Sequence, residues 1–177
     1  MNDSMLPSNL NSLHWVRGEL EQSLSRVRSL IEQYLESGAD PLTLQQANAE
    51  LQTVRGTARM VQRFGAAIAA EEMRQTLQDL LHQRVKDAEA AYSALLGATV
   101  QLADYIGAMV EGMVDSALIL QPVINELRLA RGQTLLSESD LFVAQMRAIG
   151  FSLPAGEAGD TARSQEEARK SLPVFQV

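Results

Sequence analysis

The sequence predicts an all-α fold, an antiparallel helical bundle with a four-helix core plus additional short helices. Hydrophobic residues make up 46% of its 177 residues but aromatic residues only 5%, and good helix formers such as Ala, Leu, Gln and Glu are abundant. Apolar residues recur at intervals of three and four, the spacing of one helical face. A chain of this length has room for one domain with a sizeable core.

The first predicted helix begins near residue 13, which leaves residues 1–12 as an N-terminal extension. Its apolar stripe consists of Leu13, Val16, Leu20, Leu24, Val27, Ile31 and Leu35. The residues that follow predict a turn into a second helix. Gly38 suits a C-terminal cap, Asp40 an N-cap and Pro41 the first helical turn.

Three more long helices are expected before residue 115. The second runs from Pro41 to about Phe64, and Gly65 either ends it or lets the chain bend into a third helix, over Ala66–Val85. A fourth helix, over Asp87–Val114, contains Gly97, Gly107 and Gly112. Because glycine lowers helix stability, we expect these three to mark close approach to neighbouring helices. If the chain is a plain oligomerisation module, this helix is its interface.

Two shorter helices are expected next. One starts near Ser116, bends at Pro122, which lacks the backbone N–H that an unbroken helix needs, and reaches about Arg131. The other opens with a capping box at Ser137–Asp140 and ends before Gly150. Together these helices predict a bundle domain over residues 13–150.

Residues 151–177 are expected to form a flexible tail or linker. The stretch 154–171 is rich in Gly, Ala, Ser and charge and has almost nothing to bury. The segment Leu172–Val177 is apolar again. It is either a docking peptide or the start of a segment that continues in a longer protein.

The acidic balance of the chain bears on its partners and its compartment. With 22 acidic and 15 basic residues the net charge is −7, so we expect no nucleic-acid partner. No signal peptide is recognised, and charges such as Asp104 and Glu111 interrupt the apolar stretches, which predicts a cytoplasmic protein without membrane insertion. Having no cysteine and only two histidines, which lie far apart, the chain is expected to hold no metal or cofactor.

The segment 52–60, QTVRGTARM, lies within the second predicted helix and resembles the signature of histidine phosphotransfer (Hpt) domains. In that signature a phosphorylatable His is followed at the third position by Lys or Arg and at the fourth by Gly. Gln52 stands in the place of the His, and an amide nitrogen with a delocalised lone pair cannot be the nucleophile. The resemblance therefore implies an Hpt-like core with a degenerate phosphoacceptor position and no catalytic residue.

The residues around Gln52 predict a basic stripe. At about 100° per residue, Arg59 and Arg63 lie along the helix from Gln52, and Arg55 and Gly56 flank it. We therefore expect Gln52 to be exposed. The stripe either docks to the acidic phosphoacceptor pocket of a response-regulator receiver or is an ordinary solvated helix face.

A longer series of segments resembles a more particular family. It comprises WVRGEL at 15–20, VRGTARM at 54–60, EEM at 71–73, QPVINELR at 121–128 and LLSE at 135–138. In this order they resemble FimL proteins and the matching N-terminal region of ChpA-type pilus chemosensory kinases. The resemblance implies a cytoplasmic bacterial scaffold that links type IV pilus machinery to chemosensory signalling in twitching motility. Its expected partners are a receiver protein and a pilus-associated polar assembly protein.

Other residues provide rival interpretations. His14 is followed at the third and fourth positions by Arg and Gly, so an active phosphorelay protein that uses His14 is an alternative. Trp15 lies opposite the apolar stripe of its helix and is either a partner-binding anchor or covered by another segment. His82 is expected to be solvated. Glu71 and Glu72 diverge by about 100° on their helix, so we expect surface charges rather than an acid–base pair.

Overall fold

The computed structural model describes residues 8–37 and 40–150, and the described part of the chain forms helices and no strand. The predicted all-α class is therefore confirmed. The predicted cap at Gly38 and the predicted tail 151–177 lie outside the described residues. The helices are α1 (Ser8–Ser37), α2 (Pro41–Met60), α3 (Phe64–Leu81), α4 (Ala88–Val110), α5 (Gln121–Ala130) and α6 (Glu138–Ala148).

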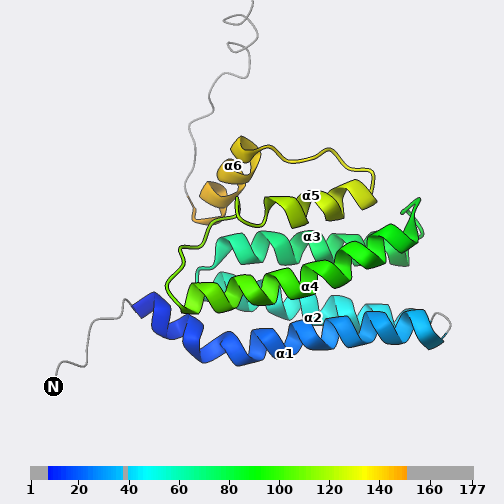
Figure 1. The fold of residues 1–177 in the computed structure, drawn as a ribbon, viewed down its shortest axis with the longest axis horizontal. Coiled ribbons are helices and arrows are strands. Elements are labelled where there is room, and N and C mark those ends of the chain that lie inside the picture. Colours follow the sequence, from blue (N-terminus) through cyan, green and yellow to red (C-terminus); the bar gives the residue numbers. More distant parts are fainter. Residues whose placement is uncertain (1–7, 38–39, 151–177) are drawn as a thin grey trace, which may run out of the picture.

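Helices α1 to α4 form an antiparallel four-helix bundle (Figure 1). α1 packs against α2 and α4, and α3 completes the ring by contacting the same two helices. The short helix α5 lies against α3 and α4, and α6 contacts α3. The predicted arrangement, a four-helix core with two added short helices, is confirmed.

The apolar stripe of α1 faces the core, as predicted, except at its end. Leu20, Leu24 and Val27 are buried, whereas Leu35 is 51% exposed. Leu35 borders a surface hollow that it shares with Tyr92 of α4. α1 also begins five residues before the predicted start, at Ser8.

The turn between α2 and α3 lies earlier than predicted. α2 ends at Met60 rather than near Phe64, which is instead the first residue of α3. Gln62 adopts a left-handed backbone conformation with φ of 60°, which reverses the chain without a glycine. Gly65, the predicted breaker, is buried in the first turn of α3.

Gly65 is required for close packing rather than for a turn. A Cβ atom added there would lie 2.6 Å from Asp115 Oδ1 and 2.9 Å from the backbone nitrogen of Ala117. The Gly65 N–H donates to Asp115 Oδ2 at 3.0 Å, and the Tyr105 hydroxyl donates to Asp115 Oδ1 at 2.7 Å. The segment after α4 is thereby fixed to the start of α3.

The glycines of α4 do not mark close approach, so that prediction was wrong. The nearest atom to an added Cβ would be 4.0 Å away at Gly97 and 3.6 Å away at Gly107. Gly112 lies beyond the end of α4 at φ of 108°, a conformation that suits glycine after a helix. α4 is nevertheless central, because it contacts α1, α3 and α5.

Two terminus predictions were confirmed and two helix boundaries were wrong. The Asp40 side chain caps α2 with Pro41 in the first turn, and Ser137 and Asp140 form the predicted capping box of α6. α3 ends at Leu81 and not at residue 85. Pro122 does not bend a helix, because α5 begins at residue 121 and a first-turn proline lacks only an N–H that has no intrahelical partner.

Among the described helices, α4 alone is long and apolar enough to cross a membrane by length and composition. Its apolar residues include Tyr92, Leu102 and Ile106, which are buried in the bundle. Of the 18-residue apolar window in α4, 44% is buried inside the bundle, so packing accounts for part of this composition.

Candidate partner-binding site

Gln52 lies exposed in the middle of α2, as predicted. Its orientation follows from the residues on the other side of the helix. Leu51, Val54 and Ala58 are fully buried and face the core, so the register of α2 turns residue 52 outward. Position 52 is therefore accessible to a partner along the side of the bundle.

Gly56 and Arg59 form the accessible surface next to Gln52. Gly56 is exposed, and a Cβ atom added there would meet nothing within 4 Å. Arg59 is exposed and forms no ion pair with any residue that the structure describes. We call Gln52, Gly56 and Arg59 the α2 face.

The other two arginines of the predicted stripe are placed differently. Arg55 is half-buried and forms an ion pair with Glu71 of α3, with 2.6 Å between Arg55 Nη1 and Glu71 Oε2. Arg63 occupies the N-cap position of α3, without a capping hydrogen bond from its side chain, and is not part of α2, because α2 ends before it. The predicted continuous stripe was therefore wrong.

Glu71 is held in a network of donors rather than projecting as a simple surface charge. Besides Arg55, it accepts hydrogen bonds from Arg74 and from Gln75, at 2.8 and 3.0 Å respectively to Oε1. The hydrogen bond from Arg74 is the main cause that lowers the pKa of Glu71 to about 2. The network joins α2 to α3.

Glu72 departs furthest from the expectation of a surface charge, because it is only 7% exposed. Its carboxylate forms ion pairs with Arg128, at 2.8 Å to Nη1, and with Arg131. Arg131 Nη1 also donates to Gln75 at 3.0 Å. These contacts fix α5 to α3. Two arginines three residues apart on a short helix were the available sequence signal.

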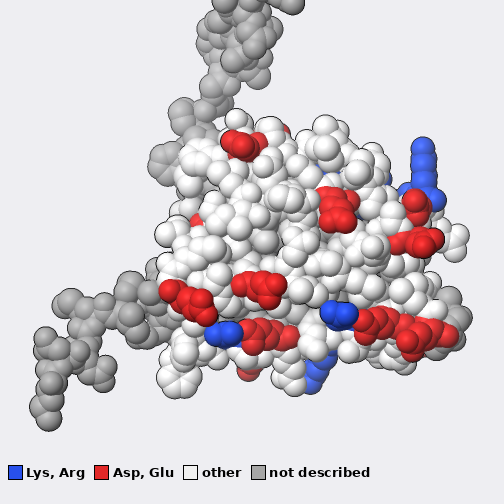
Figure 2. All heavy atoms as spheres, viewed as in Figure 1, with Lys and Arg blue, Asp and Glu red and all other residues white. Residues whose placement is uncertain are grey.

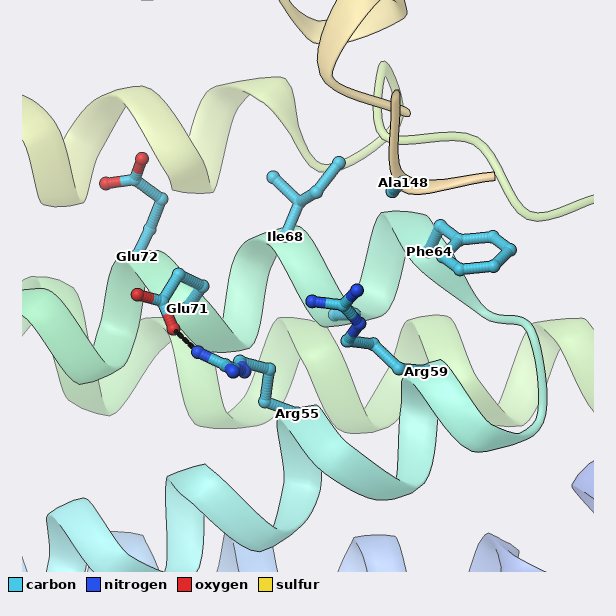
Figure 3. Close-up of a pocket in the computed structure, with 8 residues that line it drawn as sticks. Arg55, Arg59, Phe64, Ile68, Glu71, Glu72 and Ala148 are labelled. Atoms are coloured by element: carbon cyan, nitrogen blue, oxygen red, sulfur yellow. Dashed lines mark hydrogen bonds and ion pairs between the residues drawn. The ribbon is translucent and has the colours of Figure 1, made fainter. Parts of the chain in front are cut away.

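A surface hollow of about 170 Å³ lies beside the α2 face, between α2, α3 and the end of α6. Figure 3 shows the Arg59 side chain directed toward the space between Ile68 and Phe64. Its lining consists of Arg55, Arg59, Phe64, Ala67, Ile68, Glu71, Glu72 and Ala148. Because both glutamates are held in ion pairs, the surface available to a ligand is an apolar floor beside one arginine.

No protein-family model matches the chain, and no solved structure matches it. One curated protein matches along most of the chain, the scaffold protein FimL of Pseudomonas aeruginosa, with 29% identity over 170 residues. The chain is homologous to a scaffold protein. The alignment covers 94% of this chain but only 30% of FimL, so the chain spans about a third of the length of that relative.

The similarity to FimL confirms the predicted relation to that protein and extends over most of the chain. It does not single out the α2 face, because an overall identity of this kind assigns no role to one residue. The binding roles of Gln52, Gly56 and Arg59 therefore rest on geometry and on the Hpt-like signature.

The remaining candidates lie elsewhere on the bundle. Trp15 is 85% exposed on α1, which confirms that it lies outside the core. His14 is exposed in the second turn of α1, and His82 is exposed just after α3, with 2.6 Å between its Nδ1 and the Gln78 carbonyl oxygen. Within the described residues no group of three or more potential ligand residues could hold a metal ion.

Charge is unevenly distributed over the surface. Figure 2 shows a face over α1 and α4 on which acidic side chains predominate, in keeping with the net charge of −7. Arg59 belongs to α2, which lies behind these two helices in the same view. An acidic partner is repelled by the first face and attracted locally by Arg59.

The low pKa of Glu71 predicts a pH-dependent contribution to stability. Because its pKa falls from 4.5 to about 2 on folding, the contribution is present above about pH 4.5 and is lost as the pH falls toward 2. Glu71→Gln should therefore destabilise the protein at pH 7 and progressively less below pH 4.5. Urea unfolding of both proteins over this range measures the difference, and a constant difference would contradict the assignment.

Proposed function

We propose that the chain is a non-catalytic scaffold unit that binds protein partners, with an Hpt-like core whose α2 face docks a response-regulator receiver. The observation that carries the proposal is Gln52, which is exposed mid-helix where an Hpt domain has its phosphoacceptor histidine. The proposed binding unit comprises the predicted residues 13–150 together with the first residues of α1, from Ser8, and the predicted tail or linker 151–177 follows it.

The chemistry of the α2 face suits binding of a receiver without phosphoryl transfer. The Gln52 amide donates and accepts hydrogen bonds, but the lone pair of its nitrogen is delocalised into the carbonyl, so it cannot replace a histidine as the nucleophile. Gly56 leaves open space, so the backbone of a partner can approach the helix closely. Arg59 supplies a guanidinium for the carboxylates of a receiver's phosphoacceptor pocket.

The similarity to the scaffold protein FimL supports the same class of function. We propose on that basis that the chain is a cytoplasmic bacterial adaptor between type IV pilus machinery and chemosensory signalling in twitching motility. A pilus-associated polar assembly protein would be the second partner. The exposed Trp15 on α1 provides a separate anchor for it, because an exposed tryptophan can bury a large contact area against a partner.

Titration with isolated receiver domains from the source organism tests the docking proposal. Arg59→Glu is expected to weaken receiver binding by about tenfold or more, because it places a carboxylate against the acidic pocket. Lys86→Glu is the matched control, since Lys86 is exposed in the connection between α3 and α4. Equal effects of the two reversals would show that only net charge matters and that the α2 face is not the docking site.

A further inference from the structure

The hollow beside the α2 face has the size and chemistry to receive one aromatic ring. Its volume of about 170 Å³ is close to that of apolar protein cavities of about 150 Å³ that bind benzene. Phe64 and Ile68 form its apolar wall, and Arg59 lies at its edge. A guanidinium over the face of a ring is an attractive contact.

The lining of the hollow argues against a catalytic use. Glu71 is paired with Arg55 and Arg74. Glu72 is paired with Arg128 of α5 and with Arg131, which directly follows α5. Neither carboxylate is therefore available as a general base or as a metal ligand. What the hollow offers is apolar contact beside one cation, which is the chemistry of a peptide-docking site.

The sequence contains an apolar segment that is well placed to reach this hollow. Ala148 is both the last residue of α6 and part of the lining, so the chain that continues toward the C-terminus leaves from the edge of the hollow. Residues 149–171, a span of 23, separate it from Leu172–Val177, whose sequence LPVFQV includes Phe175. At about 3.3 Å per residue this connection reaches up to about 76 Å, far more than is needed.

We propose that the segment Leu172–Val177 docks into this hollow with the Phe175 ring against Ile68 and Phe64, and so acts as an internal competitor for the α2 face. Being tethered raises the effective concentration of the segment to the millimolar range, so even a weak contact is populated. Arg59 then stacks on the ring or donates to a carbonyl of the segment. The docking itself is independent of the proposed function, whereas the competition rests on it.

A spin label tests the docking in the full chain. Because the sequence has no cysteine, Gln176→Cys provides a unique attachment site for a nitroxide. Backbone amide signals of residues 55–59 and 64–68 are expected to lose most of their intensity. Signals near His82 should stay sharp, since α3 has 18 residues and is about 27 Å long.

Variants distinguish the proposed occupant from others. Phe175→Ala and Ile68→Lys should each restore the signals, with Ala148→Asp as a second lining variant if Ile68→Lys does not fold. Phe151→Ala is the aromatic control and should leave the broadening unchanged. In a mixture of spin-labelled chains with isotope-enriched chains that carry no label, broadening of the enriched chains would show docking between two copies and would overturn the proposal. The absence of broadening in the spin-labelled chain itself would also overturn it.

Competition is measured separately by receiver titration. If the closed form is populated about tenfold over the open form, Phe175→Ala should tighten receiver binding by about tenfold. Spin-label broadening without tighter receiver binding by Phe175→Ala would support docking of the segment but contradict its competition with the receiver. If neither the wild type nor any variant binds the receiver, the proposed function is contradicted. The spin-label experiment would still decide whether the segment docks.

Discussion

Replacing Glu72 with alanine is expected to lower the free energy of unfolding by about 3–5 kcal/mol. Glu72 is 7% exposed, and removing its carboxylate leaves the Arg131 side chain, itself only 4% exposed, with the more distant Asp79, at 3.7 Å from Nη1 to Oδ2, as its remaining acidic partner. Arg128 loses its partner as well. Urea unfolding monitored by circular dichroism measures the loss.

A second variant separates the buried charge from simple packing. Glu72→Met combined with Arg131→Met should be less destabilised than Glu72→Ala alone, because it removes both charges from the interior. Glu71→Ala is the neighbouring control and should cost less, since its side chain is 27% exposed. Equal, small losses for Glu72→Ala and Glu71→Ala would contradict the buried ion-pair assignment.

Gly65→Ala is expected to destabilise the protein by about 1–3 kcal/mol through overpacking. The new Cβ would lie 2.6 Å from Asp115 Oδ1, and the displacement it forces disturbs the hydrogen bonds of Asp115 to Gly65 N–H and to the Tyr105 hydroxyl. Thermal or urea unfolding gives the magnitude.

Gly56→Ala is the matched control for this glycine. It places the same methyl group in open space on an exposed helical position, so it should stabilise the protein by about 0.5–1 kcal/mol. A stabilising Gly65→Ala, or a destabilising Gly56→Ala, would contradict the packing described at the two positions.

Periodicity predicted the helices because their buried faces are continuous, but it could not place every boundary. The turn after α2 depends on Gln62, which adopts a left-handed conformation that no local propensity predicts. Gly65 was the more obvious breaker, yet its role is set by Asp115, 50 residues away. Where a tertiary contact determines the role of a residue, as at Gly65, local sequence patterns predict that role wrongly.

Only part of the α2 face and its surroundings was predictable from the sequence. Exposure of Gln52 and Arg59 follows from helical geometry alone, because buried residues of α2 fix its register. The pairing of Arg55 with Glu71 and the burial of Glu72 depend on neighbouring helices. The hollow depends also on the end of α6, and no pattern within one segment contains that information.

The most direct test of a non-catalytic scaffold is to incubate the chain with a receiver carrying labelled phosphate and to follow both binding and label. The proposed function predicts binding of the receiver to the wild type with no label on this chain, and acquisition of label by Gln52→His, whose new imidazole would stand exposed in the middle of α2. Label on the wild type that disappears in His14→Ala would contradict it and would show an active phosphorelay protein that uses α1.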